Sequence, residues 1–282
     1  MRELKTVTTI NGKLTSRRQA KVSVFDNALL YADGLFETFL AVSDQVIFID
    51  EHLDRLYRGA KVIGIEPPVK REKLAEWMVT TVKSHPAKVK KLRLTITSGE
   101  SARWVGKPGK PQVILSASPH ELPKRPYKIA VSDLRVDQGS IFRRIKTLSY
   151  AIHAASLKRA RAARCDDALL LNRRGRVAEI TSANIFWVRK NIIYTPPLSS
   201  GCLEGVTRRI TINEARGLGF SLREKQETLK QLMTSDECFL TSSLKLVTPV
   251  TKIVSGETTT TFPTGPVTKL LRRHIRRQLD LS

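Results

Sequence analysis

Apolar and polar positions along the chain follow two periods, one typical of helices and one typical of strands. Apolar residues spaced three or four apart predict an amphipathic helix over residues 51–64, and a second helix is expected over 71–84. Later helices are predicted over residues 149–163, 206–216 and 267–279. β-Prone stretches separate these helices, so the pattern predicts a mixed α/β protein.

Strands are expected where β-branched and aromatic residues alternate or gather between turn residues. Asn11 and Gly12 stand between the β-prone stretch Val7–Ile10 and Leu14, which predicts a hairpin with a tight primed turn. The other predicted strands are 91–98, 112–116, 128–134 and 238–240, together with the segments ALLLN, RVAEI, NIFWV and IIYTP between residues 168 and 196.

Two stretches rich in proline or glycine mark the organisation of the chain. The run SPHELPKRP, residues 118–126, holds three prolines and no apolar period, which suits a linker. We therefore expect a smaller N-terminal α/β domain over residues 1–119, a linker over 120–126 and a larger C-terminal domain over 127–282. A cleft between two such domains is a common place for a ligand. The segment GESARWVGKPGKP, residues 99–111, is predicted to be a mobile loop.

Composition bounds the function only loosely. With 41% hydrophobic residues, the 282-residue chain is long enough to bury a sizeable core, which excludes disorder for most of it. Its 49 Lys and Arg against 26 Asp and Glu give a formal net charge of +23, and the last predicted helix, VTKLLRRHIRRQL, is strongly basic. A basic nucleic-acid-binding protein is a remote alternative, because aromatic residues make up only 6% and do not alternate with basic ones. We expect no specific nucleic-acid partner.

The cysteines, the histidines and the N-terminus exclude further classes. Cys165, Cys202 and Cys238 are far apart and form no CxxC pair, which fits a reducing compartment and argues against a cysteine zinc site. The five histidines show no metal-ligand spacing, so we expect no metal. The N-terminus lacks the apolar core of a signal peptide, and no stretch reaches the roughly 18 apolar residues of a membrane span. The expected location is the cytoplasm, without membrane association.

Six separated segments carry a family resemblance that no single one of them would support. In order and spacing they resemble class IV (fold type IV) pyridoxal-phosphate enzymes, which include branched-chain aminotransferases, D-amino-acid aminotransferases and aminodeoxychorismate lyases. The segments are KVSVFDNALLYADGLFETF (21–39), EHLDRL (51–56), RRIKTLSY (143–150), VAEITSANIFWV (177–188), GCLEGVTRR (201–209) and LTSSLKLVTPV (240–250). The resemblance implies a two-domain α/β fold with the cofactor cleft between its domains, pyridoxal 5′-phosphate (PLP) as cofactor, and a homodimer.

Lys146 is the candidate catalytic residue. It stands just before a predicted helix with Ile145 and Leu148 around it, and such apolar surroundings favour the neutral, nucleophilic amine. Lysines are abundant here, so composition alone would make Lys146 a surface residue. The resemblance implies instead that Lys146 forms the lysine aldimine with PLP and then moves a proton as the released amine.

Two further residues are candidates for holding the cofactor ring. Glu179 ends a predicted strand, and the resemblance implies that it pairs with the pyridine nitrogen. The alternative is an edge-strand carboxylate that counters Arg176. Tyr150 follows Lys146 by four residues and resembles the tyrosine that hydrogen-bonds the phenolic oxygen in branched-chain aminotransferases, although a core tyrosine is an equal alternative.

The phosphate of the cofactor needs hydrogen-bond donors. A predicted helix opens after Gly205, so the free N–H groups of Val206 and Thr207, with the Thr207 hydroxyl, form a candidate anion site. The resemblance adds Arg55 and Ser243 as phosphate contacts. The alternatives are an ordinary first-turn threonine and a solvated helix-face arginine.

The resemblance implies a PLP-dependent aminotransferase that moves an amino group between an amino acid and a 2-oxo acid by a ping-pong mechanism. The alternative within the family is 4-amino-4-deoxychorismate lyase, which eliminates pyruvate to give 4-aminobenzoate, and Thr38 stands where the lyases carry threonine. Arg103 and Phe36 complete the substrate-binding candidates. The D-amino-acid enzymes carry a histidine where this chain has Val105 and a tyrosine where it has Phe36, so strict D-specificity is not expected.

Overall fold

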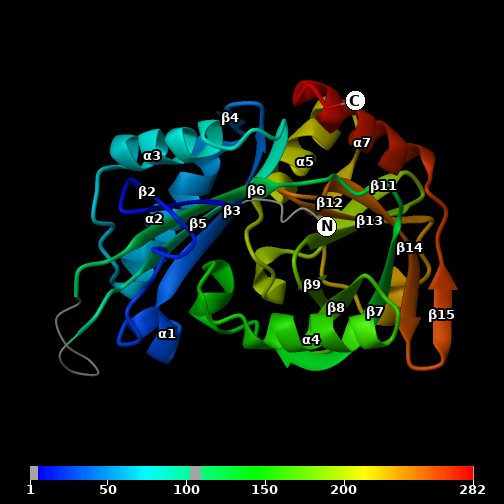
Figure 1. Cartoon of the computed structure of the whole chain (residues 1–282). Coiled ribbons are helices and arrows are strands. Elements are labelled where there is room, and N and C mark those ends of the chain that lie inside the picture. The colour runs from blue at the N-terminus through cyan, green and yellow to red at the C-terminus, as the bar shows by residue number, and fades with distance from the viewer. Residues whose placement is uncertain (1–5, 102–108, 282) are drawn as a thin grey trace. The chain divides into compact units, whose positions relative to one another are not determined.

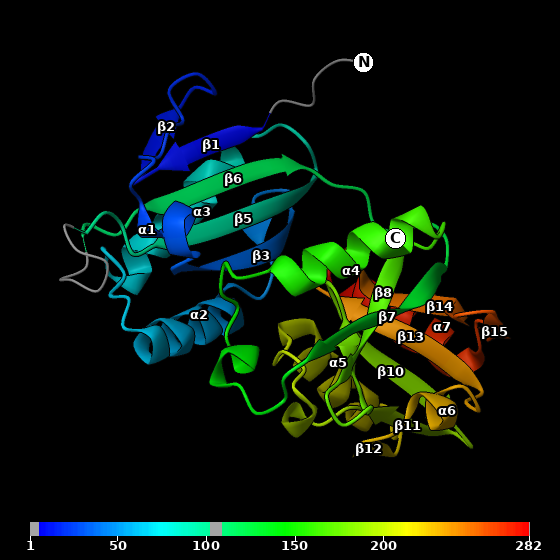
Figure 2. The same cartoon turned by 90° about the horizontal axis from the view of Figure 1, so that it is seen from below.

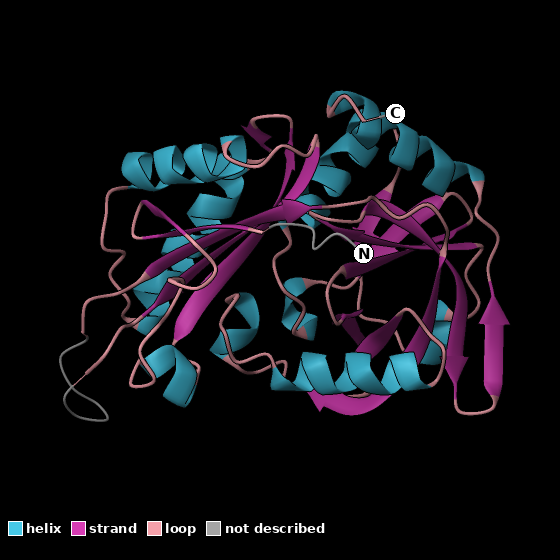
Figure 3. Cartoon of the chain, viewed as in Figure 1, coloured by secondary structure: helices cyan, strands magenta, loops and turns pink. Residues whose placement is uncertain are grey.

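The computed structural model describes residues 6–101 and 109–281, and the chain divides into two compact units. Unit 1 comprises Met1–Glu121 and Ile145–Ser149, and unit 2 comprises Leu122–Arg144 and Tyr150–Ser282. The short stretch Ile145–Ser149 thus belongs with unit 1, although its neighbours on both sides in the sequence belong to unit 2. Figure 1 labels the elements, and Figure 3 separates helices from strands. The two sheets and their helices confirm the mixed α/β class.

Unit 1 is built on a six-stranded sheet in the order β2-β1-β6-β5-β3-β4, and Figure 2 shows β1, β6, β5 and β3 side by side. Apolar faces of α2 and α3 pack on this sheet, with Leu53, Leu56, Leu74 and Met78 in one core. Its elements are β1 (Val7–Ile10), β2 (Lys13–Thr15), α1 (Asn27–Tyr31), β3 (Gly34–Val42), β4 (Gln45–Val46), α2 (Ile49–Ile63), α3 (Arg71–Lys83), β5 (Val89–Thr97) and β6 (Val113–Pro119).

The first hairpin forms for the reason that the sequence indicates. Asn11 and Gly12 have φ of 48° and 82°, as a primed turn requires, and β1 pairs with β2 antiparallel on either side of them. Gly12 also has no room for a side chain, because an added Cβ would lie 2.4 Å from the ring of Trp77. The predicted hairpin is confirmed.

Unit 2 is built on a nine-stranded sheet in the order β12-β11-β10-β13-β14-β7-β8-β9, with β15 paired to β14. Helix α4 packs against β7 and β8, while α5 and α7 pack against β13 from the other side (Figure 1). The elements are β7 (Tyr127–Val136), a 3-10 turn (Ile141–Arg144), α4 (Ala151–Ala162), β8 (Asp167–Asn172), β9 (Val177–Ile180), β10 (Asn184–Arg189), β11 (Ile192–Thr195), a second 3-10 turn (Leu198–Ser200), α5 (Val206–Gly217), β12 (Leu222–Glu224), α6 (Leu229–Leu232), β13 (Glu237–Ser242), β14 (Leu246–Ser255), β15 (Thr258–Thr261) and α7 (Pro266–Gln278).

The basic final helix packs on its own unit. Helix α7 buries Val267, Leu271 and Ile275, while Arg272 and Arg276 donate to the carbonyl oxygen of Pro123. Within residues 6–101 and 109–281, no helix is long and apolar enough to cross a membrane.

Candidate active site

Lys146 lies at the edge of the unit 1 sheet, in an extended stretch that pairs with β3. The N–H of Phe36 donates to the carbonyl of Lys146 at 2.9 Å, and the N–H of Leu148 donates to the carbonyl of Gly34 at 2.9 Å. This antiparallel pairing sets Lys146 opposite Phe36 on the same face of the sheet. The Lys146 Nζ atom lies 4.2 Å from the centroid of the Phe36 ring. The structure therefore brings the candidate catalytic lysine against one of the candidate substrate residues.

Two more side chains share this sheet face. Side chains two residues apart on a strand point to the same side, so Thr38 follows Phe36 there. Arg93 of β5 pairs with Thr38 across the strands, and its guanidinium carbon lies 4.0 Å from the Phe36 ring centroid. Sequence reasoning missed Arg93, because only the register of β3 and β5 places it beside Phe36. The third substrate candidate, Arg103, and part of the predicted mobile loop lie outside the described residues.

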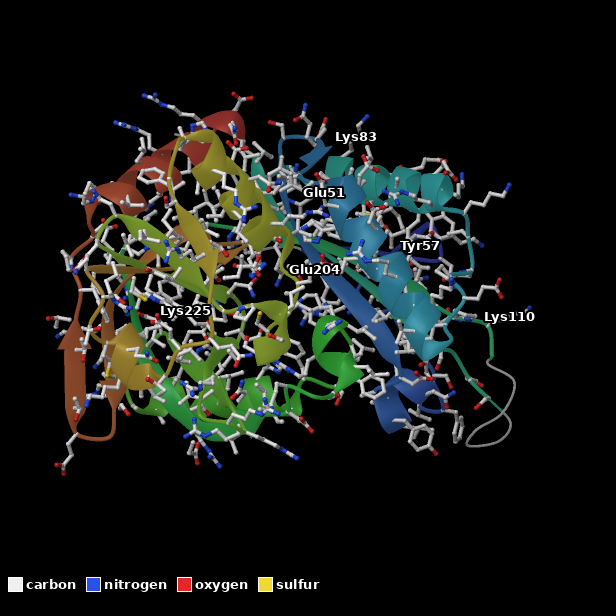
Figure 4. All side chains as sticks on the ribbon, turned by 180° about the vertical axis from the view of Figure 1, so that it is seen from behind. Glu51, Tyr57, Lys83, Lys110, Glu204 and Lys225 are labelled. Atoms are coloured by element: carbon white, nitrogen blue, oxygen red, sulfur yellow. The ribbon has the colours of Figure 1, made fainter. Side chains whose placement is uncertain are left out.

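Arg55 belongs to a buried polar cluster on α2 and the other face of β3. Its Nε and Nη2 atoms donate to Glu37 at 2.8 and 2.6 Å, and His52 Nδ1 lies 2.8 Å from the same carboxylate. All three side chains are buried. The interpretation of Arg55 as a solvated helix-face residue is therefore wrong, and Glu37 and His52 are partners that the sequence did not indicate. Glu51 and Tyr57, labelled in Figure 4, mark the same helix.

The ionisation states of Glu37 and His52 are set by burial and by the charged groups beside them. Burial alone raises the pKa of Glu37, but the charge of Arg55 and the hydrogen bonds from His52 and Arg55 outweigh it and hold that pKa well below its usual range. Burial lowers the pKa of His52, and the positive charges of Arg55 and Lys146 lower it further against the opposing effect of Glu37. The cluster at neutral pH is thus an ionised Glu37, a cationic Arg55 and a neutral His52.

Glu179 of β9 is the centre of a second buried cluster, in unit 2. One carboxylate oxygen, Oε1, accepts from Arg143 and lies 3.3 Å from His153 Nε2, while Oε2 accepts from the N–H of Leu203 at 2.8 Å. Burial raises the pKa of Glu179, but the His153 hydrogen bond and the Arg143 charge outweigh burial and lower that pKa, so Glu179 is ionised. The alternative that Glu179 counters Arg176 is wrong, because its arginine partner is Arg143.

Tyr150 caps the N-terminus of α4 and stacks on His153. The two ring centroids are 4.1 Å apart and the ring planes are inclined by 18°. Tyr150 is half-buried, so it is neither a fully enclosed core residue nor a solvated one. The structure thus links Tyr150 to Glu179 through one intervening side chain.

The first turn of α5 offers hydrogen-bond donors of the kind that an anion needs. Helix α5 begins at Val206 as predicted, after the N-cap Gly205, and its first-turn N–H groups have no partner within the helix. Gly205 has no room for a side chain, because an added Cβ would lie 2.0 Å from Asn184 Oδ1. Thr207 Oγ1 is buried and has no hydrogen-bond partner among the described residues. Figure 4 labels Glu204 in the loop that enters this helix, and Ser243 lies in the turn between β13 and β14.

A family model for amino-transferase class IV matches residues 34–253, which cover most of both units. The chain belongs to the class IV aminotransferase family. As a member of this family it is a PLP-dependent enzyme, which confirms the resemblance that the six segments carry.

Curated relatives with three different activities resemble the chain almost equally well. The "Putative branched-chain-amino-acid aminotransferase" of Methanocaldococcus jannaschii is 33% identical over 95% of this chain and 94% of its own length. The D-alanine aminotransferase of Bacillus licheniformis is 30% identical over 92% of each chain. The aminodeoxychorismate lyase of Bacillus subtilis is 31% identical over 86% of this chain and 85% of its own. These identities establish the family without selecting one reaction.

Solved structures agree with the fold. The branched-chain aminotransferase of Thermoproteus uzoniensis with norvaline has a TM-score of 0.89 at 30% identity, over 96% of this chain and 93% of its own. The branched-chain amino acid aminotransferase of Escherichia coli has a TM-score of 0.85 at 25% identity, over 95% of this chain and 92% of its own. A third branched-chain amino acid aminotransferase, complexed with N-(5′-phosphopyridoxyl)-L-glutamate, has a TM-score of 0.85 at 30% identity, over 95% and 92%. Fold type IV is therefore confirmed for this chain.

The residues of unit 2 fit PLP chemically. An ionised carboxylate offers about four acceptor positions, and the contacts that Glu179 makes with Arg143, His153 and Leu203 leave one for a protonated pyridine nitrogen. At α5, the buried hydroxyl of Thr207 and the first-turn N–H groups supply donors of the kind that a phosphate needs. Each end of the cofactor thus has a matching group.

Proposed function

We propose that this enzyme is an aminotransferase that moves an amino group between an amino acid and a 2-oxo acid by a ping-pong mechanism. The observation that carries the proposal is the buried, ionised Glu179 with one acceptor position left over. A carboxylate held ionised in this way keeps a pyridine nitrogen protonated. The branched-chain aminotransferase of Thermoproteus uzoniensis and the "Putative branched-chain-amino-acid aminotransferase" of Methanocaldococcus jannaschii support transamination as the reaction.

Lys146, Glu179 and Tyr150 act on the reactive part of the cofactor in this proposal. When bound, PLP supplies a reactive aldehyde and a ring that withdraws electrons from the substrate Cα. Lys146 acts as the nucleophile toward that aldehyde and as the base that moves the Cα proton. Glu179 holds the ring nitrogen and Tyr150 donates to the phenolic oxygen.

The remaining candidates bind the phosphate and the substrate. Arg55, Val206, Thr207 and Ser243 hold the phosphate, and an ionised Glu37 keeps the Arg55 guanidinium in one orientation. Phe36, Thr38 and Arg103 bind the substrate. We add Arg93 to this group because its guanidinium stacks on Phe36 beside Lys146 and matches the charge of a substrate carboxylate.

Lysine substitution tests the catalytic assignment. We expect Lys146→Ala to abolish turnover and the visible band that borohydride removes, whereas Lys61→Ala, at an exposed position of α2, leaves both unchanged. Full turnover by Lys146→Ala would contradict the proposal. Mass spectrometry of the borohydride-treated protein locates the modified lysine.

A second candidate function is 4-amino-4-deoxychorismate lyase. It is favoured by the Bacillus subtilis lyase, 31% identical to this chain, and by Thr38 on the sheet face of Phe36. Adding D-alanine, L-leucine or aminodeoxychorismate to the PLP-loaded protein separates the reactions. Conversion of the bound cofactor to its pyridoxamine form by an amino acid supports transamination, whereas pyruvate released from aminodeoxychorismate alone supports the lyase.

We also propose that the enzyme is a homodimer. Large apolar side chains are concentrated between residues 22 and 31, where they are exposed by 42 to 68%. Exposed apolar residues gathered in this way are typical of an interaction surface. These residues are Val22, Val24, Phe25, Leu29, Leu30 and Tyr31. Light scattering after size exclusion measures the mass, and a single monomeric species at micromolar concentration would contradict the proposal.

A further inference from the structure

His153 contacts both of the residues that we propose as ligands of the cofactor ring. It is the third residue of α4 and only 6% exposed. Its Nε2 atom lies 3.3 Å from Glu179 Oε1, and its ring stacks on Tyr150 with the centroids 4.1 Å apart. The edge of the imidazole thus faces the carboxylate while its plane faces the phenol.

Two neighbours compete for the His153 Nε2 atom. Glu179 Oε1 only accepts, whereas Arg143 Nη1, at 3.4 Å, only donates. Arg143 is already engaged, because its Nη2 donates to Glu179 and its Nε donates to the carbonyl of Gly201 at 2.9 Å. A hydrogen on His153 Nε2 satisfies the buried carboxylate, and the opposite tautomer would set two lone pairs against each other. We therefore assign the hydrogen to Nε2.

A buried imidazole at this position has a cost that packing alone does not explain. The Nδ1 atom of His153 is buried and has no hydrogen-bond partner within the part of the chain that is described. An unsatisfied buried polar atom is destabilising. A phenylalanine of similar outline would stack on Tyr150 without that cost, so the polar edge toward Glu179 is the feature that distinguishes the imidazole.

We propose that His153 is a positioning residue that orients the Glu179 carboxylate through its edge and the Tyr150 ring through its face. The inference rests on the proposed function, since it takes Glu179 and Tyr150 as ligands of PLP. Arg143 supplies a full positive charge beside Glu179, whereas His153 restricts where the remaining acceptor position points. Arg143 and His153 together occupy both acceptor positions of Oε1. Oε2 accepts only from the N–H of Leu203, so it keeps one acceptor position for the pyridine nitrogen.

Two substitutions separate the two contacts of His153. His153→Phe keeps the ring and removes the hydrogen bond, whereas His153→Gln keeps a donor and removes the ring. The 15N resonance of the pyridine nitrogen in labelled PLP reports on Glu179, and the pH midpoint of the visible band reports on the phenolic oxygen beside Tyr150. We expect His153→Phe to move the 15N resonance toward the unprotonated value and His153→Gln to move mainly the pH midpoint.

Cofactor affinity gives a third readout. Titration of the apoprotein with PLP should show about tenfold weaker binding for His153→Phe, because a Glu179 carboxylate that His153 no longer orients loses its own hydrogen bond to the pyridine nitrogen. His85→Phe is the matched control, because His85 is equally buried, at 6%, and belongs to unit 1. It should leave all three readouts at the wild-type value.

The outcomes are distinct. Wild-type protein that binds no PLP overturns both this inference and the proposed function. Wild-type protein that binds PLP, with both His153 variants unchanged in the 15N resonance and the pH midpoint, overturns this inference alone. If His153→Phe does not fold, His153→Asn takes its place, because the shorter amide has no ring and cannot reach Glu179. An Asn variant with wild-type spectra also overturns the inference.

Discussion

Replacing Glu37 by Gln tests whether the buried cluster of unit 1 holds Arg55 as the structure indicates. Glu37 is fully buried and accepts two hydrogen bonds from Arg55 and one from His52. Glutamine keeps the shape of the side chain but removes its charge, so the cation of Arg55 stays buried without a counter-ion. Breaking a buried pair by removing one partner costs about 3–5 kcal/mol. We expect a loss of that size in the free energy of unfolding of unit 1.

The assay must report on unit 1 alone, because a chain of two units need not unfold in one step. Hydrogen exchange with mass spectrometry at increasing urea gives the free energy of opening for peptides of β3 and α2. Glu76→Gln is the control, since the Glu76 and Lys73 side chains are 61% and 51% exposed and such a pair contributes at most about 1 kcal/mol. A Glu37→Gln variant as stable as this control would refute the reasoning.

The pH dependence of the loss follows from the direction of the pKa shift. The folded pKa of Glu37 lies well below its ordinary value of 4.5, because Arg55 and His52 outweigh the effect of burial. A depressed pKa contributes stability that is present above the unfolded pKa and disappears as the pH falls through the folded one. The difference between wild type and Glu37→Gln should therefore be constant from about pH 6 to 8 and shrink progressively as the pH falls below the ordinary value of 4.5. A difference that disappears near pH 6 would contradict this assignment.

Two further predictions concern unit 2. Thr207→Val should raise the Kd for PLP about tenfold, because a hydrogen bond to a charged group is lost, and leave the apoprotein as stable as before, because the hydroxyl has no partner among the described residues. Thr211→Val, one turn later with a hydroxyl in the same condition, is the control in the same titration and should not change the Kd. Asp167→Asn should destabilise unit 2 by about 3 kcal/mol, because Lys245 loses its buried partner at 2.8 Å. Hydrogen exchange of β8 peptides at increasing urea measures this loss, and an unchanged free energy of opening would contradict it.

The helices and the first hairpin could be predicted because each has a single buried face. In α2, Leu53, Leu56 and Ala60 are buried at helical spacing, and the predicted range 51–64 differs from Ile49–Ile63 by two residues at its start and one at its end. A pattern of apolar positions reports on the contrast between a buried and an exposed side. Where that contrast exists in this chain, the sequence predicts the element.

Two long strands were not predicted from the sequence, each for a different physical reason. Strand β3, Gly34–Val42, is buried on both faces apart from Thr38, so its residues do not alternate. Strand β14, Leu246–Ser255, carries Pro249 in its interior, which argues against a strand in the sequence. Phe36, Glu37 and Thr38 all belong to β3, so missing this strand also hid the face that Lys146 shares with Phe36.

The candidate site residues were predicted from motif order, whereas the residues that contact them depend on the fold. Lys146, Glu179 and Thr207 stand in segments whose order resembles the family. Arg143 and His153, the partners of Glu179, lie 36 and 26 residues before it, and no spacing rule connects them. Only the pairing of strands and the start of α4 bring these side chains together.

The net charge likewise cannot indicate, without the fold, which charged residues act at the site. The chain carries +23, yet the two arginines that pair with Glu37 and Glu179 are ones that the fold largely removes from water. Arg55 is buried and Arg143 is partly buried, each beside a buried glutamate, and an ion pair strengthens as its surroundings lose water. The arginines of α7 are partly or fully exposed, where solvent and salt screen their charge. A count of charges therefore bounds the partners of this enzyme, while burial decides which charges can hold Glu37 and Glu179 ionised.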